Sequence, residues 1–240
     1  MSVLQRYLSL LKPGWQVVPQ AHYPVPHYQA PTADTPLSAL SFTVFDMETS
    51  GLSEHKHHIV QVASMRIAEH SLDLGSAWSA LVNNEGTVHS DSRLIHEIRP
   101  VEQRTGHEES QVLQEFVERA TASVLLAYDA NFDLAFLRKA WRRYGWQQLS
   151  VVCLDLSRIA TLVLPQWRGQ AQGLDDCLRY CGIEPDDQDR HDALGDTFLA
   201  ASLALVLLSK AQRQGWQTLA ELQQALRQQE QMRSVANVSF

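Results

Sequence analysis

The chain has 240 residues, of which 45% are hydrophobic and 20% are charged. This length suits one domain with extensions, since domains typically run to about 100–200 residues, and the composition excludes an intrinsically disordered chain. No apolar run approaches the ~18 residues of a membrane span, and the longest, around 203–208, is typical of a core helix. The formal net charge of −7 argues against tight binding to nucleic acid, because affinity for phosphates comes mostly from Lys and Arg.

The negative charge is concentrated in one segment, residues 175–196. Its local charge is −6, so the rest of the chain sums to about −1. The acids are Asp175, Asp176, Glu184, Asp186, Asp187, Asp189, Asp192 and Asp196, and the bases are Arg179 and Arg190. Such a concentration of carboxylates is either a solvated acidic loop or part of a site for a hard divalent cation.

The three cysteines, Cys153, Cys177 and Cys181, occur without a secretory leader. This combination predicts a reducing compartment, taken here as the cytoplasm. Cys177 and Cys181 share a helical stripe with Leu174, and Gly182 ends the predicted helix. Core packing is therefore favoured over metal binding for this pair.

Three regions are predicted along the chain, with boundaries at 36 and 212. Six of the nine prolines lie in residues 13–36, and proline interrupts both helices and sheet ladders. Residues 1–36 are therefore expected to form an extended arm, ordered only if its aromatic side chains dock on the domain; these are Trp15, Tyr23 and Tyr28. Residues 37–212 are predicted to form the central domain.

Residues 213–240 form a Gln-rich tail. Leu219, Leu222 and Leu226 recur there at helical spacing. We expect this helix to pack on its own domain, with docking to a partner as the alternative.

The central domain is predicted to be an α/β fold with a mixed five-stranded sheet flanked by helices. Three consecutive strands and then strand–helix alternation favour this architecture. Apolar runs and their periodicity predict strands at 41–51, 58–67, 76–83, 123–129 and 151–156, and helices at 109–120, 131–145, 174–182 and 195–211.

Asp46 and Glu48 stand two residues apart at the end of an apolar strand. Side chains alternate along a strand, so both carboxylates point to the same face at the carboxyl end of that strand. Thr49, Ser50 and Gly51 follow as a turn. Taken alone, the pair is either a functional anionic site or surface decoration.

Two further segments carry candidate residues. Asp133 lies in the first turn of a helix directly after a strand, where a carboxylate also favours the helix N-terminus without any other role. His191 and Asp196 are five residues apart. They can converge only if His191 precedes the helix that contains Asp196.

Together these five residues are suited to metal-assisted hydrolysis at phosphorus. Four carboxylates from three segments can hold two divalent cations about 3.5–4 Å apart, which stabilises an in-line displacement at phosphorus. A histidine that titrates near neutrality is suited to accept the proton of the attacking water.

The motifs that contain these residues resemble those of the DEDD exonucleases. FDMETSG resembles the first motif, AYDANFDLAFL the second, and HDALGDTFLA the third in its histidine form. The closest likeness is to the proofreading epsilon subunit of bacterial DNA polymerase III and its free-standing relatives, and it covers about residues 42–208. It implies a ribonuclease H-like sheet and removal of nucleoside monophosphates from 3′ ends with two Mg²⁺ or Mn²⁺ ions.

By this resemblance, the metal carboxylates are Asp46, Glu48, Asp133 and Asp196, and His191 is the general base. It also implies that the substrate is contacted by Asp46, Met47, Glu48, Thr49, His96 and Asp196. Three positions depart from the pattern: Tyr128 and Asp129 replace His and Asn, and Glu97 replaces Gly. Asp129 can serve as an extra outer acid or as a helix N-cap, of which the N-cap is favoured.

Other residues have two interpretations each. Arg138, Lys139, Arg142 and Arg143, with Trp141 and Trp146 among them, either guide a phosphate backbone or form a solvated face with the tryptophans packed inward. Two interpretations also apply to His55, His57 and His58. They either lie in a loop beside the first motif or form a second metal site. Asp155, which ends the fifth strand, is expected to be a cap at the sheet edge.

The sequence therefore predicts a metal-dependent exonuclease that acts on DNA 3′ ends. Two alternatives remain open at this point. One is an exoribonuclease of the oligoribonuclease or ribonuclease T type, and the other is a non-catalytic subunit associated with a polymerase. A polymerase or repair partner is possible in each case, and no membrane association is expected.

Overall fold

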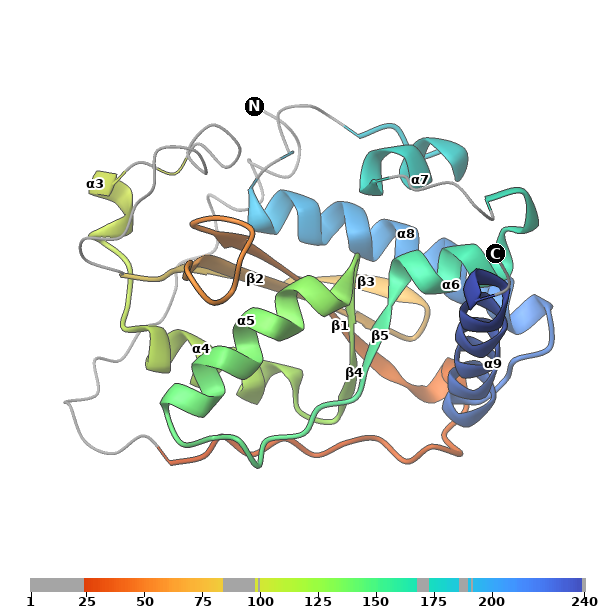
Figure 1. The fold of residues 1–240 in the computed structure, drawn as a ribbon, viewed down its shortest axis with the longest axis horizontal. Helices are drawn as coiled ribbons and strands as arrows, with labels where there is room; N and C mark the ends of the chain where they lie inside the picture. The colour runs from red at the N-terminus through yellow and green to blue at the C-terminus, as the bar shows by residue number, and fades with distance from the viewer. Residues whose placement is uncertain are drawn as a thin grey trace.

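A mixed five-stranded sheet forms the centre of the molecule (Figure 1). The computed structural model describes residues 24–83, 98, 100–167, 173–185, 190 and 192–238. The strands are β1 (Ser41–Thr49), β2 (Ile59–Ala68), β3 (Ser71–Leu81), β4 (Ser123–Ala127) and β5 (Cys153–Asp155), in the order β3-β2-β1-β4-β5. β2 is antiparallel to both its neighbours, whereas β1, β4 and β5 run parallel. The predicted α/β fold with a mixed sheet is confirmed.

Helices cover both faces of this sheet (Figure 1). The helices are α3 (Pro100–Gln103), α4 (Glu109–Ala120), α5 (Ala130–Arg143), α6 (Leu156–Val163), α7 (Leu174–Tyr180), α8 (Ala193–Arg213) and α9 (Leu219–Val238), with the 3₁₀ turns η1 (Leu37–Ala39) and η2 (Pro165–Trp167). Buried residues of α6, α8 and α9 share one hydrophobic core with the sheet. Those of α4 and α5 share the other.

The chain between β5 and α7 contains a helix that the sequence reading missed. α6 buries Leu156, Ile159 and Val163 on one face, in the helical pattern i, i+3, i+7. Its start has a recognisable signal, because Asp155 is the N-cap and its carboxylate accepts a hydrogen bond from the Ser157 amide at 2.8 Å. The capping role expected for Asp155 is confirmed.

Alternation along β1 sets the direction of its two acids. Phe45 and Met47 are buried in the core beneath α4 and α5, and Val44 is buried in the core beneath α8. Asp46 and Glu48 therefore face the α8 side, at the strand's carboxyl end.

α8 is the longest helix in the described part of the chain. Leu199, Leu203 and Leu207 are buried against the sheet and α6. Within the described residues this one helix is long and apolar enough to cross a membrane by length and composition, yet 61% of its apolar window is buried inside the protein. Its apolar character is accounted for by its place in the core.

The arm and the tail both contact the domain. The Tyr28 hydroxyl donates to the Ser123 carbonyl at 2.6 Å and accepts from the Val152 amide at 3.2 Å, which docks this part of the arm; Trp15 and Tyr23 lie outside the described residues. In the tail, Leu219, Leu222 and Leu226 are buried in the α6–α8 core. Packing of α9 on its own domain, which the leucine spacing predicts, is what the structure shows.

The buried leucines of α9 generate a stability prediction. Leu222→Ala is expected to lower the free energy of unfolding by about 2–5 kcal/mol, because it removes buried methylene groups and leaves a cavity. Gln224→Ala, at an exposed position of the same helix, should change stability by less than about 0.5 kcal/mol. Urea denaturation of both variants measures the difference, and equal effects would show that α9 is not part of the cooperative unit.

Candidate active site

Carboxylates from separate segments meet at the carboxyl ends of the parallel strands. Asp46 and Glu48 come from the end of β1, and Asp196 comes from the first turn of α8. One oxygen of each lies within 4.8 Å of the others, a spacing that can hold a metal ion. Asp133, in the first turn of α5, is outside this group but close enough for the charges of Asp46 and Glu48 to act on it. The structure thus gathers all four predicted acids.

Burial and mutual repulsion make three of these groups weaker acids than usual. Burial raises the pKa of Asp46 to about 7, and the neighbouring charge of Asp192 adds to this effect. Burial and the charge of Asp46 raise the pKa of Glu48 to about 8. The pKa of Asp133, which is only 3% exposed, is also raised, first by burial and then by Asp46 and Glu48. The site therefore holds more carboxylates than positive charges, and a divalent cation would offset this excess.

One arginine partly compensates this negative charge. Arg190 forms ion pairs with Asp196 and, at 2.6 Å, with Asp175 of α7. Its charge lowers the pKa values of Asp46 and Glu48 against the effect of burial. Arg190 therefore links α7 to the carboxylates at the start of α8.

Gln61 of β2 holds the start of α8 in place. Its side-chain amide nitrogen donates to the Asp192 carboxylate at 2.9 Å and to the Ser79 hydroxyl at 3.0 Å. Its oxygen accepts from the Ala193 amide at 3.3 Å. Asp192 is itself the N-cap of α8, accepting from the Gly195 amide. Sequence reasoning missed this role, although a polar residue in an otherwise buried strand is a signal that could have found it.

The loop from residue 50 to residue 58 stands beside the carboxylates and is held at several points. The Ser50 hydroxyl accepts from the His58 amide at 3.0 Å, and Lys139 of α5 donates to the His57 carbonyl at 2.9 Å. A Cβ on residue 51 would lie 2.6 Å from the His57 ring, so only glycine lets the loop close in this way. The loop presents Leu52 with 82% of its surface exposed.

The other predicted site residues either have side chains engaged within the protein or lie outside the described residues. His191 and His96 are among the latter, as is Glu97. Met47 is buried in the core, and the Thr49 hydroxyl donates to the Gly51 carbonyl at 2.9 Å. In the described part of the chain, the three loop histidines belong to no group suited to a metal.

Burial and backbone geometry show how the tryptophans and Asp129 around α5 are placed. Trp141 and Trp146 are buried, 3% and 1% exposed, so they pack inward and do not stack on a ligand. Arg143 pairs with Glu109. The favoured interpretation of Asp129 as a capping side chain is wrong. Asp129 occupies the N-cap position, but its left-handed backbone (φ 56°) leaves the carboxylate without a capping hydrogen bond, since that bond needs an extended N-cap.

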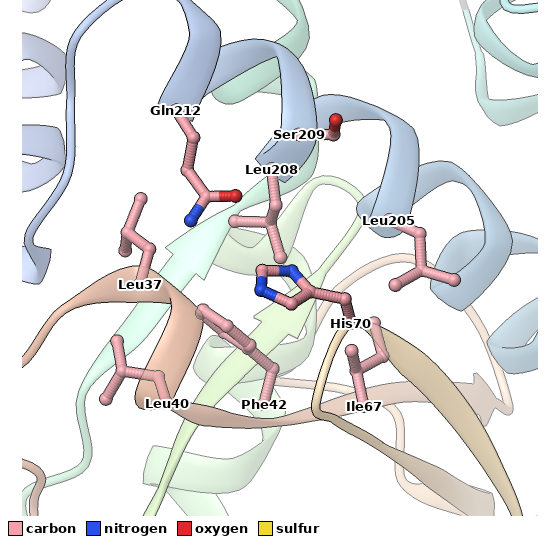
Figure 2. A pocket seen from close by; sticks show the side chains of 9 residues that line it. All are labelled: Leu37, Leu40, Phe42, Ile67, His70, Leu205, Leu208, Ser209 and Gln212. Carbon is pink, nitrogen blue, oxygen red and sulfur yellow. The ribbon is translucent and has the colours of Figure 1, made fainter.

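A hollow lies near the start of β1, at the end of the strand away from the carboxylates, as Figure 2 shows. It measures about 350 Å³ and is lined by Leu37, Leu40, Phe42, Ile67, His70, Leu205, Leu208, Ser209 and Gln212. The His70 imidazole points into it from the β2–β3 turn. It contains no carboxylate and is not the place of the predicted chemistry.

The fold and the acidic site define a nuclease of known class. The family described as "Exonuclease" matches residues 43–204, most of the chain. The chain therefore belongs to this exonuclease family, within the DEDD superfamily.

Particular relatives are larger than this chain. A DNA polymerase III subunit epsilon-like protein of Rhodobacter capsulatus is 34% identical over 189 residues, covering 78% of this chain and 26% of that protein. A PolC-type DNA polymerase III of Streptococcus sanguinis is 27% identical over 140 residues, covering 58% of this chain and 9% of that protein. The chain thus spans about a quarter or less of the length of these relatives.

A solved structure shares the fold. E. coli exonuclease I in complex with a dT13 oligonucleotide matches with a TM-score of 0.58 at 21% identity, covering 72% of this chain and 42% of that one. This likeness supports the ribonuclease H-like sheet.

The raised pKa values predict how stability depends on pH. The ordinary pKa values of Asp46 and Glu48 are 3.8 and 4.5, and those in the folded protein are about 7 and about 8. Between these limits the folded state binds more protons than the unfolded state, so the free energy of unfolding falls as pH rises. The metal-free protein should melt at a lower temperature at about pH 8.5 than at about pH 5.5, and Mn²⁺ should raise the melting temperature at the higher pH.

The control for this measurement removes the two titrating groups. The double variant Asp46→Asn and Glu48→Gln should have a flatter dependence of melting temperature on pH in EDTA. An unchanged slope would mean that other groups cause the dependence.

The contacts of Gln61 generate a second prediction for the site. Gln61→Leu leaves the Ala193 amide and the Asp192 carboxylate without this partner, so we expect a loss of about 1–3 kcal/mol of stability. We also expect weaker binding of Mn²⁺ in calorimetric titration, because Asp196 follows one turn later. Ser79→Ala removes only one of the three bonds and serves as the matched control. Equal metal affinity in both variants would contradict a positioning role for Gln61.

Proposed function

We propose that the protein is a divalent-metal-dependent 3′-to-5′ exonuclease that releases nucleoside 5′-monophosphates from DNA 3′ ends. The observation that carries this proposal is the convergence of Asp46, Glu48 and Asp196 within 4.8 Å, with Asp133 close by. Membership of the exonuclease family supports it. A binding module has no need to hold four carboxylates close together.

The four acids are suited to bind Mg²⁺ or Mn²⁺, and we propose that two such ions bind per site. Carboxylate oxygens are the ligands that these hard cations prefer, and no described sulfur or nitrogen belongs to the group. A bound divalent cation would polarise a phosphate oxygen and lower the pKa of a coordinated water. The carboxylates bind it in their ionised form, so cation binding and loss of their protons are linked.

We assign the general base to His191. It directly precedes Asp192, the residue that Gln61 and the α8 N-terminus fix in place. A neutral imidazole can take the proton of the attacking water as a general base. We assign contact with the terminal nucleotide of the substrate to the exposed Leu52 and to the segment around His96.

DNA as substrate is supported by the relatives. The Rhodobacter capsulatus protein is epsilon-like, and the E. coli exonuclease I structure contains a DNA oligonucleotide. The negative charge of this chain implies weak unaided affinity for DNA, so a polymerase or repair partner, or a short substrate, is proposed. The described cysteines are unpaired, which supports action in the reducing cytoplasm.

Digestion of 5′-labelled oligonucleotides tests this function. With Mn²⁺, single-stranded DNA should shorten stepwise from its 3′ end and release nucleoside monophosphates, whereas EDTA should stop the reaction. Duplex DNA and RNA of the same sequence, run side by side, identify the preferred strand. Faster degradation of RNA would assign the protein to the exoribonucleases.

Single variants connect the activity to the site. Asp133→Asn should abolish nucleotide release without unfolding the protein, and His191→Ala should slow turnover by roughly 10²- to 10⁴-fold. Asp129→Asn, four residues before Asp133 and exposed, should keep near-normal activity. Wild-type rates in the Asp133 variant would refute the assignment of the site.

A further inference from the structure

Two cysteines lie one helical turn apart on α7, beside the active site. Cys177 is fully buried against α8, and Cys181, at the C-cap of α7, is partly exposed. The Cys181 amide donates to the Cys177 carbonyl at 3.0 Å, and the two thiols hydrogen-bond to each other. A partly exposed cysteine thus lies one helical turn from a buried cysteine.

The two sulfurs differ in reactivity. The hydrogen bond from Cys177 lowers the pKa of Cys181 to about 7, and the positive charge of Lys210 acts in the same direction. The same bond raises the pKa of Cys177. Burial raises the pKa of Cys153, the third cysteine. The thiolate is the nucleophilic form of cysteine, so Cys181 is the sulfur that an oxidant should attack first.

We propose that Cys181 and Cys177 form a peroxide-sensitive thiol pair that regulates the enzyme. Accessible cysteines beside a second, resolving cysteine are the usual sites of reversible oxidation. Oxidation at sulfur does not depend on nuclease activity, whereas its regulatory effect rests on the function proposed above.

The chemistry proceeds in two steps with hydrogen peroxide as oxidant. The Cys181 thiolate attacks one peroxide oxygen, the O–O bond breaks, and a sulfenic acid forms while hydroxide leaves. The Cys177 sulfur then attacks the Cys181 sulfur, the S–O bond breaks, and the departing hydroxide takes the thiol proton as water. Overall, two thiols lose two protons and two electrons, and peroxide is reduced to two waters.

Closing this disulfide requires a change in α7. Cβ atoms four residues apart on a helix are about 5–6 Å from each other, whereas a disulfide needs about 3.5–4.5 Å. The last turn of α7 must therefore open. Gly182 follows Cys181 with a φ of 76°, so the helix ends at this point. The change would have to break backbone hydrogen bonds of this turn, among them those from the Cys181 amide to the Cys177 and Leu178 carbonyls.

Opening the last turn of α7 would affect the positions of the site carboxylates through two sets of contacts. Asp175, on the same helix, pairs with Arg190, which pairs in turn with Asp196. The Tyr128 hydroxyl interacts with Cys177 and donates to the Gly173 carbonyl at 3.2 Å. Tyr128 comes just before α5, which contains Asp133. A shift of α7 thus disturbs the supports of two metal acids.

Peroxide treatment of the full chain, followed by alkylation and peptide mass mapping, tests the chemistry. We expect a Cys177–Cys181 disulfide that dithiothreitol reverses, with Cys153 still alkylated. In Cys177→Ala, Cys181 should instead accumulate as a sulfenic acid that dimedone traps. In Cys181→Ser, Cys177 should remain reduced. Circular dichroism confirms the fold of each variant, and Cys181→Ser, at a partly exposed position, serves if the Cys177 variant does not fold.

The nuclease assay on the same samples tests regulation. Oxidised wild type should lose activity by about fivefold or more and recover it with dithiothreitol, whereas Cys181→Ser should be insensitive to peroxide. Oxidation of Cys153 as fast as Cys181 would overturn the thiol pair. A disulfide without loss of activity would overturn its regulatory role. Reduced wild type without nuclease activity would count against the proposed function alone, because the mass map still decides the sulfur chemistry.

Discussion

Electrostatic repulsion among buried carboxylates is the constraint on which this structure depends. Asp46 and Glu48 share a short stretch of β1, and Asp133 and Asp196 approach them from two helices. Bringing such groups together away from water disfavours their charged forms, which is why the pKa values of Asp46, Glu48 and Asp133 rise. The rest of the fold has to supply the stability that this cluster removes.

That stability comes from the two cores on either side of the sheet. α8 is buried along most of its length, and its apolar packing fixes the position of Asp196 at its start. On the other face, α5 buries Leu134, Phe136 and Leu137 directly after Asp133. Each acid is thus held in position by a neighbouring apolar stretch of the chain. Burial of that stretch itself stabilises the fold. Arg190 contributes a local positive charge where the repulsion is greatest.

Much of this arrangement was predictable from the sequence. Period-two alternation in β1 places Asp46 and Glu48 on one face, and the position of Asp133 just after a strand brings it to the same sheet edge. The order of strands and helices predicted the mixed sheet, and the resemblance to the DEDD exonucleases then indicated its ribonuclease H-like type and a metal-binding role for Asp196. Each of these inferences rests on local periodicity or on a motif.

What the sequence could not provide was contact between distant side chains. Gln61 and Asp192 are 131 residues apart, and no local pattern predicts that they meet. The pairing of Arg190 with both Asp175 and Asp196 depends in the same way on how α7 lies on α8. The left-handed backbone at Asp129 was missed because an acid before a helix usually takes the extended N-cap conformation.

The register of the β1–β2 hairpin has a consequence for folding. Gln61 lies opposite Glu48 in this antiparallel pair, so one pairing places both the acid and the residue that holds α8. A slip of one residue would turn every side chain of one strand to the other face. Gln61 would then point away from the α8 N-terminus, and Asp192 would lose its partner. A chain that pairs these strands wrongly therefore cannot assemble the site, so the acidic cluster forms only in correctly registered molecules.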